Sequence, residues 1–173
     1  MSAEAIKQLV RDVPDFPKKG ITFRDITPLL DNHQAFAETM RLLSAPFKGK
    51  AITKVLGVES RGFLLCAPVA LELGAGIVPI RKKGKLPRKT VSASYALEYG
   101  SDTLEMHADA LKGGDKIIIV DDVLATGGTC AAVAEMARGL GARVEAAAFL
   151  IELDFLGGRS KLKDIPVHSL IHY

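Results

Sequence analysis

The chain of 173 residues contains no tryptophan, two cysteines and few aromatic residues, which make up 6% of it. Cys66 and Cys130 are too few for a disulfide framework and lack metal-ligand spacing, so they fit the reducing cytoplasm. The histidines are scattered without ligand spacing. No apolar run approaches the roughly 20 residues that cross a bilayer. Residues 1–11 mix charges with isolated apolar positions, unlike a signal peptide. We therefore expect a cytoplasmic protein without a membrane segment.

Aliphatic residues dominate what is present, and 48% of the chain is hydrophobic. This length and composition predict one domain, residues 1–173, with a sizeable core. Strand and helix patterns alternate, which indicates an α/β fold with a mainly parallel, twisted sheet flanked by helices. We expect helices at about 2–11, 33–46, 61–74, 131–141 and, from a weaker pattern, 156–162, and strands at 54–58, 76–80, 117–121 and 143–153.

Two segments depart from this alternation. Residues 12–30 carry Pro14, Pro17 and Pro28, which prevent a long helix, so we expect a small N-terminal hood folded over the sheet. Residues 91–106 alternate in short polar steps, which predicts a two-stranded antiparallel flap.

The most informative segment begins with a β-branched apolar run, Ile117 to Val120, typical of a buried parallel strand. Asp121 and Asp122 follow, and the small-residue loop Ala125-Thr126-Gly127-Gly128-Thr129 then leads into a helical pattern. Ligands of open α/β sheets bind at the carboxyl ends of strands. A loop of small residues at a helix N-terminus offers unpaired N–H groups to a phosphate.

The neighbouring residues indicate which phosphate compound would bind. A nucleotide-hydrolysing loop would place a lysine directly after the glycines, whereas Thr129-Cys130 follows Gly128 here. Adjacent carboxylates suit a sugar phosphate, whose vicinal hydroxyls they can hold. The alternative is a plain strand, turn and helix, with Thr126 or Thr129 as N-cap. Unpaired acidic residues are costly to bury, which makes that alternative the weaker one.

Residues 81–89 concentrate positive charge, although the formal net charge of the chain is only +3. Such a run can be a solvated loop or a nucleic-acid surface. Nothing nearby reads as a recognition helix, and aromatic residues for stacking single strands are missing until Tyr95. A polyanionic small molecule explains the cluster equally well. Its members are Arg81, Lys82, Lys83, Lys85, Arg88 and Lys89.

A second strand-to-helix junction, Glu59-Ser60-Arg61-Gly62, follows the strand that ends at Val58. The guanidinium of Arg61 can present several donors to a pyrophosphate, and Gly62 permits close backbone approach. The alternative is a helix start capped by Ser60 with an exposed arginine. We expect this junction to lie beside the phosphate loop.

Four blocks resemble the adenine phosphoribosyltransferase family, a branch of the type I phosphoribosyltransferases. They are residues 23–28 (FRDITP), 59–63 (ESRGF), 95–100 (YALEYG) and the segment from Asp121 to Thr129. The resemblance covers essentially the whole chain. It implies the type I phosphoribosyltransferase fold with hood and flap, and purine salvage: adenine and 5-phospho-α-D-ribose 1-diphosphate give AMP and pyrophosphate, with Mg²⁺ held mainly by substrate and water.

The resemblance also implies roles for individual residues. Phe23 would stack on adenine, the backbone of Thr22 and Arg24 would read the edge of the base, and Leu153 would close its other face. Glu59, Ser60 and Arg61 would bind pyrophosphate around a cis peptide bond between Glu59 and Ser60. This sequence has Thr22 where a larger apolar residue is familiar, a minor departure if only the backbone reads the base.

In the family the basic loop, here Arg81, Lys82 and Lys85, reaches the pyrophosphate of a neighbouring subunit, which implies a homodimer. The resemblance implies that Glu98 is the acid or base of the flexible catalytic loop, with Tyr99 beside it as a substrate contact. The alternative is a solvated loop carboxylate, as most loop glutamates are.

Two rival functions stay open. One is a phosphoribosyltransferase for another purine base, and the other is a non-catalytic regulator of the same fold. A 6-oxo purine calls for a donor such as lysine, and a regulator would need a DNA-binding module for which the residues before the hood leave no room.

Overall fold

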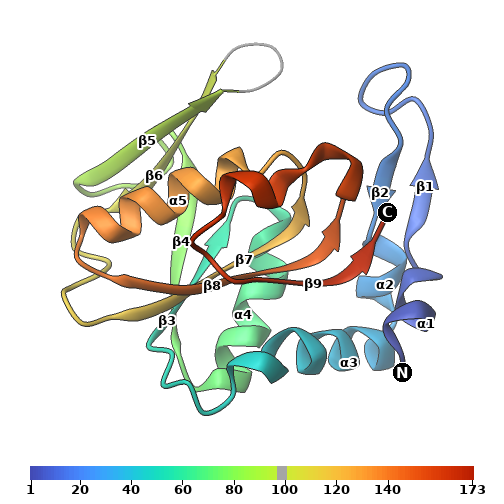
Figure 1. Cartoon of the computed structure of the whole chain (residues 1–173), viewed down its shortest axis with the longest axis horizontal. Coiled ribbons are helices and arrows are strands. Elements are labelled where there is room, and N and C mark those ends of the chain that lie inside the picture. Colours follow the sequence, from blue (N-terminus) through green and yellow to red (C-terminus); the bar gives the residue numbers. More distant parts are fainter. Residues whose placement is uncertain (97–100) are drawn as a thin grey trace.

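The computed structural model describes residues 1–96 and 101–173. A seven-stranded mixed sheet in the order β5-β6-β4-β3-β7-β8-β9 forms the centre of the molecule (Figure 1). Five strands run parallel, namely β4 (Gly76–Lys82), β3 (Lys54–Val58), β7 (Lys116–Leu124), β8 (Arg143–Glu152) and β9 (Val167–His172). The antiparallel hairpin of β5 (Thr90–Ala96) and β6 (Ser101–His107) continues the sheet at β4. The predicted α/β class with a mainly parallel sheet is confirmed.

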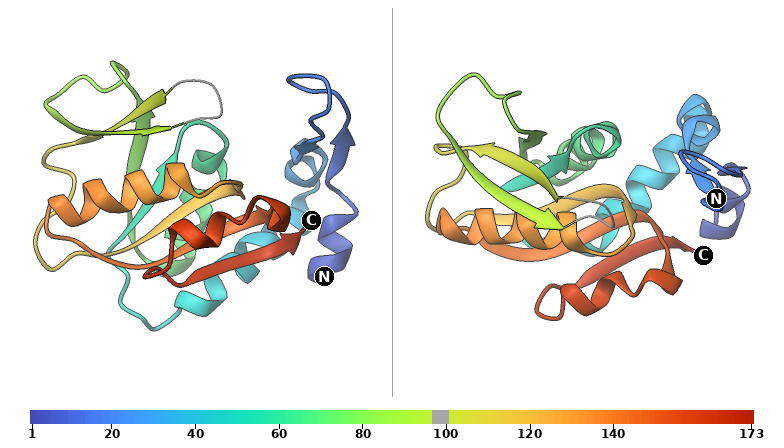
Figure 2. Two further views of the ribbon diagram at one scale, coloured as in Figure 1. Left: turned by 45° about the horizontal axis from the view of Figure 1, so that its top comes forward. Right: turned by 90° about the horizontal axis from the view of Figure 1, so that it is seen from above.

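Helices cover both faces of the sheet because β7 supplies apolar side chains to each. Ile118 and Val120 pack in the same cluster as α4 (Arg61–Leu73) and α3 (His33–Ser44). Ile117 and Ile119, which point the other way, pack with α5 (Gly128–Gly139). All four β7 side chains are fully buried. The two helix layers are seen from further directions in Figure 2.

The hood is a small sheet of its own at the β9 edge of the molecule (Figure 1). β1 (Arg11–Val13) pairs antiparallel with β2 (Phe23–Asp25), and the short α2 (Thr27–Asp31) follows. The helix expected at 2–11 is wrong over its second half. α1 covers only Ala3–Lys7, with its N-cap at Ser2, because Arg11–Val13 pairs with β2 instead.

Several other boundaries also differ from the prediction. α3 ends at Ser44 and gives way to a 3₁₀ turn, Ala45–Phe47, because Pro46 has no N–H to continue the helix. The helix expected at 156–162 consists of two 3₁₀ turns, Asp154–Leu156 and Gly158–Lys161, separated by Gly157 in a left-handed conformation. The strand β9 was not predicted. In the described ranges, no helix combines the length and apolar character that a membrane crossing requires.

Candidate active site

The carboxyl end of β7 and the start of α5 form a small hollow. α5 begins at Gly128, three residues before the predicted start, and Gly127 is its N-cap. No side chain caps this helix, so neither Thr126 nor Thr129 takes the role that a plain capped helix requires. Among the described residues, none accepts a hydrogen bond from the backbone amides of residues 126–130. These donors remain available to a ligand at the positive end of the helix dipole.

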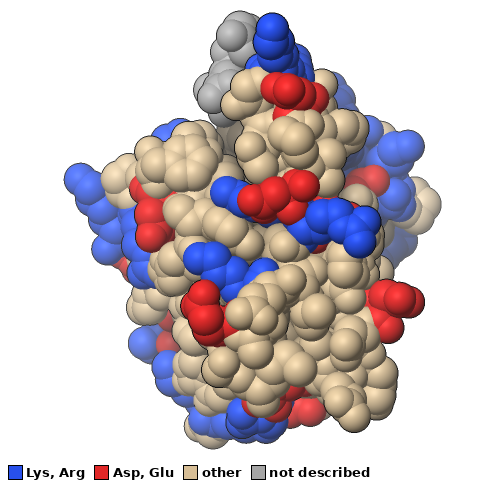
Figure 3. Space-filling model, turned by 90° about the vertical axis from the view of Figure 1, so that its right-hand side faces the viewer, with Lys and Arg blue, Asp and Glu red and all other residues tan. Residues whose placement is uncertain are grey.

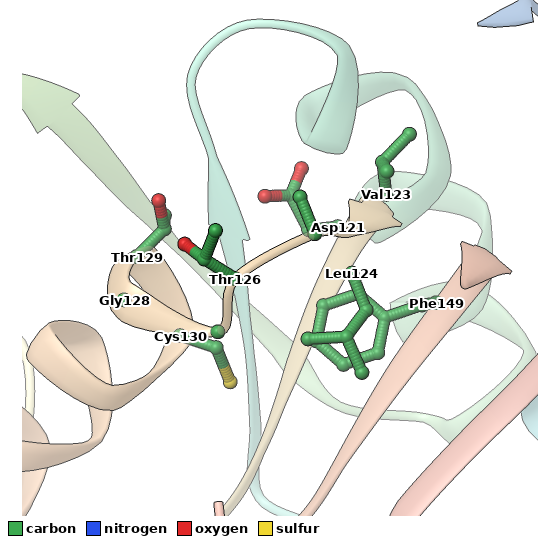
Figure 4. A pocket seen from close by; sticks show the side chains of 10 residues that line it. Asp121, Val123, Leu124, Thr126, Gly128, Thr129, Cys130 and Phe149 are labelled. Carbon is green, nitrogen blue, oxygen red and sulfur yellow. The ribbon is translucent and has the colours of Figure 1, made fainter. Parts of the chain in front are cut away.

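The hollow next to these amides is small, with a cavity volume of about 60 Å³. The carboxylate of Asp121 and the hydroxyls of Thr126 and Thr129 lie on the same side of the loop, whereas the thiol of Cys130 points away from them (Figure 4). Burial raises the pKa of that thiol to about 12, so it stays protonated and uncharged near neutral pH. The lining residues are Asp121, Val123, Leu124, Ala125, Thr126, Gly127, Gly128, Thr129, Cys130 and Phe149.

Gly127 is required by the shape of this loop. Its φ is +79°, which side chains with a Cβ seldom adopt. A Cβ built there would lie 2.4 Å from the carbonyl oxygen of Gly158. The backbone of Gly158 therefore supports the loop from behind, a contact between distant segments for which the sequence carries no signal.

The two aspartates differ in environment. The Oδ1 atom of Asp121 accepts a hydrogen bond from the amide of Asp122 at 2.9 Å. Burial and the neighbouring charge of Asp122 raise the pKa of Asp121 well above its ordinary value. Asp122 is only 6% exposed and forms an ion pair with Arg61, with Nη2 and Oδ2 2.7 Å apart. Asp121 therefore faces the hollow, whereas Asp122 is held by Arg61 at the start of α4.

Arg61 also links the start of α4 to the hood. Its guanidinium lies over the ring of Phe23, 4.6 Å from the centroid, and Nη1 donates to the carbonyl of Arg24 at 3.5 Å. β3 lies directly beside β7 in the sheet, which brings Arg61 to Asp122. The prediction that the two strand-to-helix junctions lie side by side is thus confirmed. Ser60 makes no side-chain cap, and the Glu59–Ser60 peptide bond is cis, as expected.

The basic loop is tied to the same junction through Glu59. The Nε and Nη2 atoms of Arg81 lie 3.2 and 3.4 Å from the Glu59 carboxylate, which also accepts from the amide of Lys82 at 3.0 Å. Bonding to Arg81, and then to Lys82, lowers the pKa of Glu59. Lys85 offers its carbonyl to Arg81 and leaves its own side chain exposed. Arg81 therefore pairs within its own chain here.

Phe23 and Leu153 lie on different elements. Phe23 in β2 is half-buried and meets Phe16 edge to face at 5.2 Å, while Thr22 before it is exposed. Leu153 directly follows β8, and its amide donates to the carbonyl of Leu124 at 3.0 Å, next to the loop. Glu98 and Tyr99 lie outside the described residues.

Charge on the hood side of the molecule is mixed. On the face shown in Figure 3, Lys and Arg side chains lie beside Asp and Glu side chains. Among the described residues, one group of three potential metal ligands was found, Glu152, Asp154 and His172. Arg159 already binds both Glu152 oxygens at 2.7 Å, and the loop after β7 does not contribute to this group. The end of β7 offers an aspartate pair and the loop after it offers backbone donors, which together suit a ligand that brings its own metal-binding oxygens.

Comparison with known proteins identifies relatives along the whole chain. Residues 25–166 match the model of the phosphoribosyl transferase domain family. The chain is 54% identical over 170 residues to the adenine phosphoribosyltransferase of Geobacter metallireducens, covering 98% of this chain and 99% of that protein.

Solved structures agree with the sequence comparison. The adenine phosphoribosyltransferase of Thermoanaerobacter pseudethanolicus superposes with a TM-score of 0.97 at 48% identity, over 99% of this chain and 100% of that one. The Saccharomyces cerevisiae adenine phosphoribosyltransferase gives 0.90 at 43% identity over 97% of each chain; that crystal contains adenine and D-2,5-dideoxy-2,5-imino-altritol 1,6-bisphosphate.

Proposed function

Because this chain belongs to the phosphoribosyltransferase family, in which its close relatives are adenine phosphoribosyltransferases, we propose that it forms AMP and pyrophosphate from adenine and 5-phospho-α-D-ribose 1-diphosphate. The observation that carries the proposal is the uncapped start of α5 beside the Asp121 carboxylate. Free amides and a carboxylate pair, side by side, match a phosphate and the hydroxyls of the sugar that carries it.

The loop Ala125–Thr129 binds the 5′-phosphate through the amides at the start of α5 and the two threonine hydroxyls. Asp121 and Asp122 accept hydrogen bonds from the ribose hydroxyls. As pyrophosphate leaves, positive charge develops on the ribose ring, and the fixed negative field of the carboxylates stabilises that charge. Holding the sugar at both ends positions its anomeric carbon for attack by the base.

Adenine binds between the ring of Phe23 and the side chain of Leu153, with the backbone of Thr22 and Arg24 at its edge. Support comes from the half-buried, accessible placement of both side chains and from the adenine in the yeast relative. Glu98 acts as acid or base toward the imidazole proton of the base, with Tyr99 as a further substrate contact. The flap, residues 91–106, excludes water from the reactive ribosyl centre.

Pyrophosphate leaves toward Ser60 and Arg61, and Arg81, Lys82 and Lys85 reach it from the neighbouring subunit. Within each chain, Glu59 keeps the junction and the basic loop together. Mg²⁺ fits this site as a companion of the substrate, bound mainly by phosphate oxygens and water near Asp121 and Asp122. When bound, it neutralises negative charge on the leaving group.

We also infer a homodimer, whose interface includes the outer surface of α4 and β4. Three large apolar side chains there, Leu64, Leu71 and Ile77, are 50%, 83% and 47% exposed. Such apolar surface favours burial against another protein. Arg81 lies at the end of β4, so a second copy bound here would bring basic residues near a neighbouring site. Two free, buried thiols support a cytoplasmic location.

Product analysis tests the function directly. Purified protein is incubated with 5-phospho-α-D-ribose 1-diphosphate, Mg²⁺ and adenine, hypoxanthine, guanine or xanthine, and nucleotides are separated by chromatography. We expect AMP and an equal amount of pyrophosphate from adenine, and much slower reaction with the 6-oxo bases. Faster conversion of a 6-oxo base would support the transferase for another purine. Binding without any product would support the regulator.

A further inference from the structure

Two cations contact the ring of Tyr173. The guanidinium of Arg24 is 3.8 Å from its centroid, and the ammonium of Lys7 is 4.5 Å from it. Arg24 also forms an ion pair with Asp12, which lies opposite it on β1. Through this one arginine, Tyr173 is connected to both strands of the hood.

The hood side chains divide between two faces. Successive residues of a strand point in opposite directions, so Arg24 is turned to Tyr173 while Phe23 is turned to Arg61. A shift of Arg24 against Tyr173 therefore moves Phe23 on the other side of the same strand. Tyr173 therefore contacts the residue next to Phe23, which is one wall of the proposed adenine site.

The backbone of Tyr173 reaches the opposite wall. Its amide donates to the carbonyl of Glu152 at 3.0 Å, and its carbonyl accepts from the amide of Asp154 at 2.9 Å. These two residues flank Leu153 directly. Tyr173 is thus fixed by hydrogen bonds beside Leu153 and by ring stacking beside Phe23 (Figure 1 shows the end of β9 next to β2).

We propose that Tyr173 is a positioning residue for adenine, which sets the separation of Phe23 and Leu153 through its contact with Arg24. The inference rests on the proposed function and deepens it. Among the described residues, Tyr173 makes no hydrogen bond or cation–π contact with the sugar-phosphate part of the site at the start of α5. Loss of the ring should therefore affect adenine and spare 5-phospho-α-D-ribose 1-diphosphate.

The test compares Tyr173→Leu, Tyr173→Phe and Lys7→Met in steady-state kinetics with each substrate varied in turn. Tyr173→Leu removes the ring from Arg24, whereas Tyr173→Phe keeps it. Lys7→Met is the matched control, since it removes the other stacked cation, and its bond to the carbonyl of His172, without touching the hood. Thermal unfolding of each variant records the purely structural effect.

For Tyr173→Leu we expect KM for adenine to rise about threefold to tenfold, as the loss of one cation–π contact implies. KM for 5-phospho-α-D-ribose 1-diphosphate should stay unchanged. Tyr173→Phe should restore the wild-type value, and Lys7→Met should lower the melting temperature without changing KM for adenine. If Tyr173→Leu does not fold, Arg24→Gln removes the same contact from the other side and carries the same expectation.

Three results would overturn the inference: an unchanged KM for adenine in Tyr173→Leu, an equal rise for both substrates, or the same rise in Lys7→Met. Each of these requires an active wild-type protein. Failure of the proposed function is distinguishable, because the wild-type protein would then form no AMP, and the positioning role would be rejected with it.

Discussion

Gly62→Ala places a methyl group against the carboxylate of Asp121, which faces the hollow. A Cβ at Gly62 would lie 2.7 Å from Oδ1 of Asp121 and 3.2 Å from the carbonyl oxygen of Val120. Ordinary contact begins at 3.4 Å, so the carboxylate must move by about 0.7 Å or the start of α4 must retreat from β7. Since Oδ1 also accepts the amide of Asp122, either movement disturbs both aspartates.

The expected loss of stability is small. Overpacking typically costs about 1–3 kcal/mol, and alanine in a helix recovers at most about 1 kcal/mol relative to glycine. The net destabilisation should therefore be about 0–3 kcal/mol. Activity should fall much further, because a misplacement near 1 Å can cost about a hundredfold in rate. We expect kcat/KM to fall about tenfold to a hundredfold while the protein stays folded.

Gly139→Ala is the matched control. Gly139 is the last residue of α5, and a Cβ there meets nothing within 4 Å. AMP formation and thermal unfolding are measured for both variants. Gly139→Ala should keep wild-type kinetics. A folded Gly62→Ala protein with wild-type kcat/KM would refute the reasoning, since the position of the Asp121 carboxylate would then not govern the reaction.

Three further predictions concern the charged groups. Asp121→Asn should abolish most activity yet leave the protein at least as stable as the wild type at pH 7, because the raised pKa of Asp121 means that its protonated carboxyl favours folding. That contribution is present below the ordinary pKa of 3.8 and is lost as the pH rises through the folded value, so in thermal melts from pH 3 to 8 the advantage of Asn over the wild type should vanish toward acid. Equal losses of activity and stability at pH 7 would indicate a structural role. Glu98→Gln should lower turnover about a hundredfold or more with little change in the affinity for 5-phospho-α-D-ribose 1-diphosphate, measured by calorimetry, and wild-type turnover would leave Glu98 a loop carboxylate. If Arg81 serves the neighbouring site, mixing Arg81→Ala protein with a double Asp121→Asn, Asp122→Asn protein should restore activity on subunit exchange, to about half of the wild-type activity per heterodimer. No recovery would assign Arg81 to its own subunit, where it pairs with Glu59.

The elements predicted best from sequence are those whose local pattern and burial agree. Ile117–Val120 is an uninterrupted β-branched run, and all four side chains are buried as a central parallel strand requires. The residues that line the hollow were predictable for a related reason. The aspartates, the loop and the start of the helix follow one another along the chain, so the connection itself keeps them close together in space.

The elements that were mispredicted depend on partners distant in sequence. α1 stops at Lys7 because Arg11–Val13 pairs with Phe23–Asp25, and Val167–His172 becomes a strand by pairing with β8. The partners of Arg61 could not be predicted from the sequence either. Asp122 and Phe23 are 61 and 38 positions away from Arg61 in the sequence, respectively, and only the fold brings them into contact with it. Periodicity records which face of an element is apolar, and it carries no information about such pairings.

A crystal structure of the protein with ribose 5-phosphate tests the central claim most directly. That molecule contains the sugar and the phosphate that this part of the site is proposed to hold, and it lacks both adenine and pyrophosphate. We expect the phosphate on the amides of residues 126–129 and the ribose hydroxyls within hydrogen-bonding distance of Asp121 and Asp122. A phosphate bound elsewhere, with the start of α5 left unchanged, would contradict the account.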